Sequence, residues 1–256
     1  MTDLDVARSG AVLTLTLDRP DQLNALTDEL ADALAGELEA AAAYDDVRVV
    51  VLRGAGRAFC AGADIVGAEA PMQLDVQALD RANRIVRAIT RLDKPVLAAV
   101  HGPAAGVGCS IALASDLAVA AESASFLLAF ARIGLMPDGG TSATVAAAIG
   151  RARAMRMALL AEPLSGREAY DAGLVSHLAA DDAFETVVTD VVGRLASGAP
   201  LGQAATKRAV NAATFAGLDE ALERERTAQT MLLRTRDAAE GMRAFAERRT
   251  PDYEGE

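Results

Sequence analysis

The chain has 256 residues and is acidic, with 36 Asp and Glu against 25 Lys and Arg and a net charge of −11. Proteins that bind nucleic acid present a basic face, so this balance argues against nucleic acid as a partner. Hydrophobic residues make up 52% of the chain, enough to bury one sizeable core, and no apolar run reaches the length of a membrane span. The acidic N-terminus lacks the apolar stretch of a secretory signal, so we expect a cytoplasmic protein.

Strand and helix patterns alternate along the first part of the chain. Residues 12–17 alternate Leu with Val or Thr, which predicts a half-buried strand. Thr27 is a good N-cap for a helix that begins with two acidic residues and continues through an alanine run to Ala43. A second apolar strand is predicted at 47–52. Strand, helix and strand in this order favour parallel pairing, as in α/β proteins.

The alternation continues to about residue 200, and beyond it only helices are predicted. Residues 125–133 are compatible with strand or helix, and residues 66–75, which show no period, are expected to form a mobile loop. We predict a core at 1–200 and a C-terminal helical domain at 201–256. Beyond the first strands and helix, we expect strands at 95–100 and 117–120 and helices at 78–92, 143–149, 152–160 and 165–173. A long helical segment, interrupted at Gly241, is expected at 218–246.

Residues 94–116, KPVLAAVHGPAAGVGCSIALASD, predict a buried strand, a glycine-rich turn and a buried helix. The first turn of a helix carries backbone N–H groups without intrahelical partners, which can bind an oxyanion. Close packing of strand and helix also explains the glycines, and this stretch taken alone favours that interpretation. Residues 57–65, RAFCAGADI, repeat the pattern, because a strand again ends in small residues. Two such turns can present two N–H donors to one carbonyl oxygen.

Together, FCAGAD and HGPAAGVGCSIALASD resemble the enoyl-CoA hydratase/isomerase (crotonase) family. The resemblance covers the whole chain, and its further motifs are RP with NAL near the start, IGLMPDGGT, GRA, AGLV, ATK and EGMRAF. It implies an α/β fold built as a spiral of ββα units. It also implies C-terminal helices that assemble a homotrimer or a dimer of trimers and close over an acyl-CoA site.

Crotonases hold the thioester carbonyl of an acyl-CoA with two backbone N–H groups. On this resemblance the donors are Ala63 and Val107, although the family usually has glycine at the second position. Coenzyme A is part of the substrate, and no other cofactor and no metal is implied. Four basic residues are candidates to bind the CoA phosphates: Arg19, Arg53, Arg57 and Lys207. For any one of them, an ordinary solvated surface charge is the favoured interpretation. The resemblance places substrate or CoA contacts at Arg19, Asn24, Ala25, Ala61, Asp64, Ile65, Phe130 and Phe245.

The two glutamates that activate water in hydratases of this family are absent. Their positions hold Ser110 and Phe130. Asp138, in GLMPDGG, matches an aspartate that shuttles protons in isomerase members, and one carboxylate suffices for a 1,3-proton shift. Double-bond isomerisation is therefore favoured, with Asp138 catalytic. The alternatives are a hydratase with a non-standard acid/base, a non-catalytic acyl-CoA-binding protein in which Asp138 is only a turn residue, and, well behind, a dehalogenase.

The two cysteines and the two histidines are the remaining candidates for a chemical role. Cys60 and Cys109 lie in the two proposed donor turns and are expected to be buried thiols without a disulfide. His101 precedes the glycine-rich turn and can either reach the ligand or serve the structure, whereas His177 is expected to be structural. No nucleophile elbow accompanies them.

Overall fold

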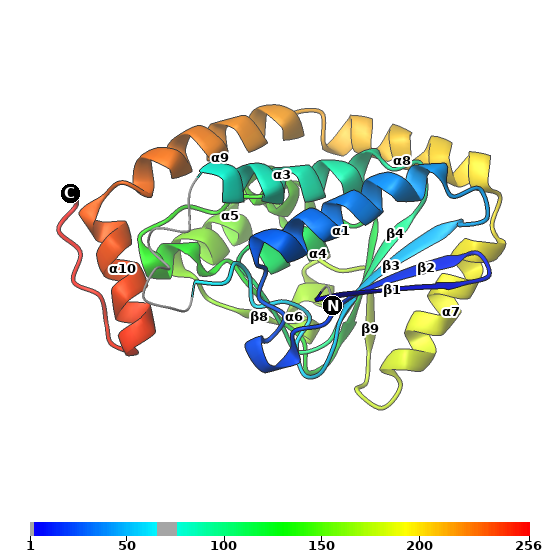
Figure 1. Ribbon diagram of the computed structural model, residues 1–256, viewed down its shortest axis with the longest axis horizontal. Helices are drawn as coiled ribbons and strands as arrows, with labels where there is room; N and C mark the ends of the chain where they lie inside the picture. The colour runs from blue at the N-terminus through cyan, green and yellow to red at the C-terminus, as the bar shows by residue number, and fades with distance from the viewer. Residues whose placement is uncertain (1–2, 66–75) are drawn as a thin grey trace.

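The computed structural model describes residues 3–65 and 76–256 (Figure 1). The loop predicted at 66–75 therefore lies outside the described residues. The main sheet has six strands in the order β1-β2-β3-β4-β6-β9, and its β1–β2 pair is antiparallel while the other pairs are parallel. The α/β prediction is thus confirmed. The strands are β1 (Leu4–Ser9), β2 (Val12–Leu17), β3 (Val49–Gly54), β4 (Val96–Val100), β6 (Leu117–Ala121) and β9 (His177–Ala179).

Helices cover both faces of this sheet, which explains why its inner strands are apolar on both sides. Val50 and Leu52 of β3 join the core beneath α1 (Asp28–Ala40) and α3 (Val76–Arg91). Val49 and Val51 point the other way and pack in a second cluster with α7 (Phe184–Ser197). Figure 1 shows α1 and α3 on one side of the strands and α7 on the other.

A second, three-stranded sheet lies beside the first. It consists of β5 (Pro103–Ala105), β7 (Ser125–Leu127) and β8 (Leu164–Ser165) in the order β5-β7-β8. The ambiguous segment 125–133 thus contains both structures, since β7 is followed by the 3₁₀ helix η3 (Ala129–Ile133). Shorter 3₁₀ turns, η1 (Pro20–Gln22) and η2 (Ala41–Ala43), flank α1.

The central helix predicted after the glycine-rich turn is α4 (Val107–Ala114), and almost all of it is buried. The helices predicted at 143–149 and 152–160 form one element, α5 (Thr141–Leu160), with a break at Gly150, whose φ is 76°. The capping box predicted at Ser165 is present and opens α6 (Gly166–Asp171).

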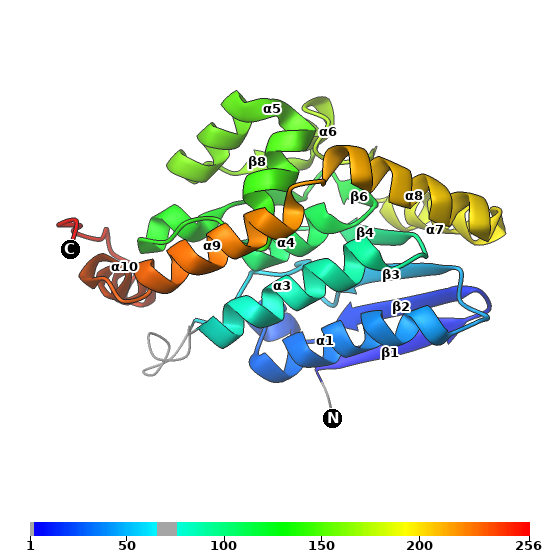
Figure 2. The ribbon, with the colours of Figure 1, turned by 90° about the horizontal axis from the view of Figure 1, so that it is seen from above.

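Three helices end the chain: α8 (Pro200–Thr214), α9 (Leu218–Leu232) and α10 (Arg236–Glu247). The interruption predicted at Gly241 is wrong, because Gly241 lies inside α10 and the break comes earlier, where Thr235 caps the new helix. Figure 2 shows α9 lying between α3 and α5, and it packs against both. Helix α10 packs against η3, and the hydroxyl of Tyr253 donates to the Arg132 carbonyl, 2.9 Å away. The division into a core at 1–200 and a helical domain at 201–256 stays a prediction. No helix within residues 3–65 and 76–256 is long and apolar enough to cross a membrane.

Candidate active site

A cavity of about 110 Å³ lies where the two proposed donor turns meet α3, η3 and α9. The first donor turn lies within residues 57–65 and the second within residues 94–116. Among the residues that the structure describes, the cavity lining is almost entirely apolar, with one carboxyl group and one carboxamide. Such a cavity suits an apolar ligand whose reacting atoms meet a few polar groups. The lining residues are Ala61, Gly62, Ala63, Ile65, Ala78, Leu79, Ala82, Gly106, Val107, Ala129, Phe130, Ile133, Leu135, Asp138, Gln229 and Leu233.

Backbone hydrogen bonds hold the two donor turns together. The Cys60 N–H donates to the Pro103 carbonyl at 3.1 Å, and the Ala105 N–H donates to the Cys60 carbonyl at 2.9 Å. The turns touch so closely that a Cβ added to Gly62 would lie 2.9 Å from the Ala105 carbonyl oxygen. Gly62 also has a φ of 102°, a conformation that side chains rarely adopt. Glycine at this position therefore keeps the turns in contact.

Ala63 and Val107, the two predicted oxyanion donors, both line the cavity. Ala63 forms a parallel β-bridge with Leu26, and the residues on either side of Ala63 make its hydrogen bonds. The Leu26 N–H donates to the Gly62 carbonyl, and the Asp64 N–H donates to the Leu26 carbonyl. Val107 is the first residue of α4, where an N–H has no intrahelical acceptor. Neither N–H donates a hydrogen bond within the part of the chain that the structure describes. The geometry thus fits a two-donor oxyanion hole.

Asp138 lies in the loop between η3 and α5, and its side chain is buried in the cavity wall. The backbone of this loop is held by Ser110 of α4, whose hydroxyl donates to the Asp138 carbonyl at 2.9 Å. Thr141 donates a second hydrogen bond to the same carbonyl, also at 2.9 Å. Ser110, one of the two residues predicted to replace a hydratase glutamate, thus supports the loop that carries Asp138.

The Asp138 carboxyl group is in an unusual environment. Burial raises its pKa to about 7, partly offset by a hydrogen bond from Gln229, with a further upward contribution from the nearby Glu225. Gln229 Nε2 donates to Asp138 Oδ2 at 3.0 Å, whereas Oδ1 is buried and has no hydrogen-bond partner among the described residues. A carboxyl group with a pKa near neutrality can both accept and return a proton at physiological pH.

Helix α9 supplies two buried polar residues that the sequence analysis missed, Gln229 and Glu225. The Glu225 carboxylate accepts hydrogen bonds from the N–H groups of Gly140 at 2.7 Å and Ser142 at 2.9 Å. Burial raises the Glu225 pKa. A signal was present in the sequence: with Leu218, Ala221 and Leu222, these residues form one helical stripe that is buried in the structure. Polar residues inside such a stripe need buried partners.

The predicted substrate contacts divide into two groups. Ala61, Ile65 and Phe130 line the cavity, so the position of the second hydratase glutamate is apolar wall. Arg19, Asn24, Ala25 and Asp64 do not line it. The Arg19 guanidinium pairs with Asp3 at 3.1 Å and with Asp64 at 2.9 Å, and it donates to the Ala25 carbonyl.

Asn24 is fully buried, and its amide nitrogen donates to the carbonyls of Ala55 and Ala58. Its contacts bind the chain to itself, and a role in CoA binding stays a prediction. Phe245, on α10, is 52% exposed and does not line the cavity, so its predicted closure over CoA also stays a prediction. Among the other predicted phosphate contacts, Arg57 is exposed and Arg53 pairs with Glu185.

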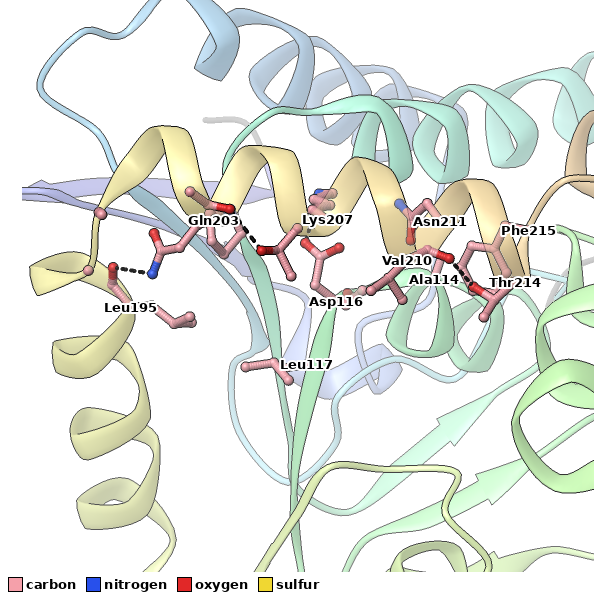
Figure 3. Close-up of a pocket in the computed structure, with 16 residues that line it drawn as sticks. Ala114, Asp116, Leu117, Leu195, Gln203, Lys207, Val210, Asn211, Thr214 and Phe215 are labelled. Atoms are coloured by element: carbon pink, nitrogen blue, oxygen red, sulfur yellow. Dashed lines mark hydrogen bonds and ion pairs between the residues drawn. The ribbon is translucent and has the colours of Figure 1, made fainter.

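A larger cavity of about 690 Å³ lies along α8, between it, α7 and the segment 114–117 (Figure 3). At its floor the Lys207 ammonium pairs with the Asp116 carboxylate at 2.7 Å and donates to the carbonyls of Ile89 and Lys94. Its three N–H donors are therefore all engaged. Figure 3 shows Lys207 and Asp116 facing each other. These contacts give Lys207 a structural role, and a contact to CoA phosphates stays a prediction.

The cysteines and histidines contribute no reactive group to the cavity lining. Cys60 and Cys109 are free and buried, as expected, and burial raises the pKa of each thiol to about 12. The His101 ring lies 2.9 Å from the Gly56 carbonyl and packs against Phe184, and it does not line the cavity. His177 lies beside the Ser176 hydroxyl.

Comparison with known proteins identifies the family. The model of the enoyl-CoA hydratase/isomerase family matches residues 7–256. The chain belongs to this family. It is 37% identical to 1,2-epoxyphenylacetyl-CoA isomerase of Escherichia coli, covering 95% of each chain. It is 36% identical to 2,3-dehydroadipyl-CoA hydratase of the same species, covering 100% of each.

Among solved structures, an enoyl-CoA hydratase from Mycobacterium avium subsp. paratuberculosis superposes with a TM-score of 0.93 at 49% identity, covering 98% of each chain. The fold is therefore that of the crotonase family, and the protein is an acyl-CoA enzyme. Relatives named as isomerases and relatives named as hydratases both match the chain over nearly its whole length, so its reaction has to be inferred from its own site.

Proposed function

We propose that the protein moves a double bond along the acyl chain of an enoyl-CoA, with Asp138 as the acid/base group. The observation that carries the proposal is that Asp138 is the one carboxyl group lining the described cavity. Ser110 and Phe130 occupy the positions where hydratases of the family carry glutamates. The substrate is a CoA thioester, and coenzyme A enters as part of it.

The chemistry follows from the two parts of the site. The N–H groups of Ala63 and Val107 receive the thioester oxygen, and each such donor is worth about 3 kcal/mol when charge develops on that oxygen. The ionised Asp138 removes a proton from the carbon next to the thioester, and the resulting enolate is delocalised into the neighbouring double bond. The carboxylic acid then returns the proton two carbons further along. No water takes part, which agrees with the apolar lining.

Hydration is the second candidate, because 2,3-dehydroadipyl-CoA hydratase and the mycobacterial structure named as a hydratase are similar over the whole chain. Hydratases must hold and activate a water molecule between two acid/base groups. Here Phe130 contributes an aromatic ring to the cavity wall, and among the described residues Asp138 alone contributes a carboxyl group to the lining. This arrangement favours isomerisation over hydration.

The test is turnover of 3-enoyl-CoA and 2-enoyl-CoA thioesters over a range of chain lengths, for the wild type and Asp138→Asn. We expect the wild type to isomerise 3-enoyl-CoA faster than it hydrates 2-enoyl-CoA. We expect Asp138→Asn to lower kcat with little change in thioester affinity, since the amide keeps the shape of the side chain but cannot take a proton. Equal turnover by both proteins would make Asp138 a turn residue and end the proposal.

We further propose a cytoplasmic homotrimer, or a dimer of trimers, in keeping with the mixed-charge C-terminal helices and the family resemblance. Sedimentation of the purified protein measures this directly. A monomer at micromolar concentration would contradict it.

A further inference from the structure

The side-chain amide of Gln229 has only one orientation that satisfies its neighbours. Its Oε1 accepts the Met136 N–H at 3.1 Å, and its Nε2 donates to the Met136 carbonyl at 2.9 Å and to Asp138 Oδ2 at 3.0 Å. Turning the amide over would set Nε2 against the Met136 N–H and Oε1 against two acceptors. Both Nε2 hydrogens are therefore committed, one of them to Asp138.

This orientation makes the two oxygens of the Asp138 carboxyl group unequal. Oδ2 faces an N–H donor, so it accepts a hydrogen bond whether the group is ionised or neutral. A proton on Oδ2 would place two hydrogens against each other, because the Gln229 N–H already points at this oxygen. The neutral acid therefore carries its proton on Oδ1. Oδ1 is buried and has no hydrogen-bond partner within residues 3–65 and 76–256. The oxygen that can gain and lose a proton is thus fixed by a residue 91 positions away in the chain.

Among the described residues around Asp138, the charged group that acts on its carboxyl group is Glu225, also on α9. The neighbouring elements contribute uncharged side chains: Leu79 and Ala82 from α3, Ser110 from α4 and Phe130 from η3. Gln229 and Glu225 therefore act on Asp138 in opposite directions. The hydrogen bond from Gln229 favours the ionised form, whereas the charge of Glu225 disfavours it.

We infer that Gln229 is the positioning residue of this site: it orients the Asp138 carboxyl group and reserves Oδ1 for the transferred proton. The inference rests on the proposed function, in which Asp138 shuttles that proton. It gives helix α9 a part in the chemistry beyond covering the cavity.

The experiment compares Gln229→Met, which keeps the length of the side chain and removes the donor, with Glu225→Gln, which removes the charge from the same helix. The titration of Asp138 is followed by ¹³C NMR of the aspartate side-chain carboxyl carbons, and Asp138→Asn identifies its signal. We expect the Asp138 pKa to rise in Gln229→Met and to fall in Glu225→Gln. General loosening of the loop would not move the pKa in opposite directions.

Turnover of 3-enoyl-CoA gives the second readout. We expect kcat of Gln229→Met at pH 7 to fall about 10- to 100-fold, the usual worth of a hydrogen bond to a charged group, with KM changed less than about twofold. We also expect its pH–rate profile to move to higher pH. If Gln229→Met does not fold, Gln229→Glu replaces it, since an added carboxyl group beside Asp138 also raises the Asp138 pKa.

The outcomes separate the inference from the proposed function. If Asp138→Asn turns over like the wild type, the proposed function fails and the inference fails with it. If Asp138→Asn is inactive while the Gln229 variant keeps wild-type kcat and an unmoved Asp138 titration, the proposed function stands and the inference alone is overturned. Titrations that move in the same direction in the Gln229 and Glu225 variants also overturn it.

Discussion

Asp138 should cost the folded protein stability at neutral pH, and Asp138→Asn should remove that cost. Burial raises the pKa of this carboxyl group from its ordinary value of 3.8 to about 7 in the folded chain. Below the ordinary value the group is protonated in both the folded and unfolded states, so it contributes nothing. As the pH rises from about 4 to about 7, the unfolded chain loses the proton while the folded chain retains it. Stability therefore falls across this window.

The size of the effect follows from the two pKa values. Each unit of difference between the folded and unfolded pKa corresponds to about 1.36 kcal/mol. The Asp138 carboxyl group therefore lowers the free energy of unfolding by ~4 kcal/mol once the pH exceeds the folded pKa. The hydrogen-bonding cost of the amide introduced by Asp138→Asn is independent of pH, so it cancels when one pH is compared with another. We expect the free energy of unfolding of Asp138→Asn, relative to the wild type, to increase by about this amount between pH 4 and pH 8.

Urea denaturation of both proteins across this range measures the difference directly, because the carboxyl groups away from Asp138 titrate alike in the two chains. The assay needs no substrate, so it tests the state of Asp138 independently of turnover. A stability difference that stays flat from pH 4 to pH 8 would mean that the carboxyl group titrates near its ordinary pKa. Asp138 would then lack the near-neutral pKa that a proton shuttle needs at physiological pH.

Three further substitutions test the scaffold of the site. Val107→Pro removes one oxyanion donor at a helix position that tolerates proline, and turnover assays should show a loss on the order of 100-fold; an unchanged rate would remove Val107 from the site. Gly108→Ala would place a Cβ 2.5 Å from the Cys60 carbonyl oxygen and push α4 away from the first donor turn, so kcat should fall. Gly193→Ala is the control, because a Cβ added there meets no atom within 4 Å, and it should leave kcat unchanged. Lys207→Met leaves Asp116 buried without its cation and should cost about 3–5 kcal/mol in urea denaturation, with CoA-thioester affinity unchanged; weaker binding would restore Lys207 as a phosphate contact.

Local signals in the sequence predict most of the elements that carry the site. The Thr27 hydroxyl caps α1 by accepting the Leu30 N–H at 3.2 Å, and Ser165 and Glu168 form the expected capping box. These features depend on residues three positions apart, which a single sequence displays. Strand β1 escapes prediction because only Leu4 of its six residues is buried, so the edge strand shows no alternation.

The candidate site could be predicted only in part, for a physical reason. The donor turns and Asp138 lie in motifs that are contiguous in sequence, and the structure brings them to one cavity. The partners of Asp138 come from α9, and only tertiary packing decides which loop a distant helix will meet. The stripe through Leu218, Leu222, Glu225 and Gln229 shows that α9 buries two polar residues, but it does not name their partners.

Ser110, at a position where the family resemblance predicts a glutamate in hydratases, is built into the surrounding structure. Its hydroxyl donates to the Asp138 carbonyl at 2.9 Å, and a carboxylate in its place would set one acceptor against another. The space is also taken, because a Cβ on Gly139 would lie only 2.7 Å from the Ser110 Cβ. A glutamate at position 110 would therefore require the loop at 136–140 to move, and the Gln229 and Glu225 hydrogen bonds hold that loop from the other side. The serine, the loop and the polar face of α9 thus form one connected arrangement around the Asp138 carboxyl group, which suits the proposed proton shift better than the activation of water by two glutamates.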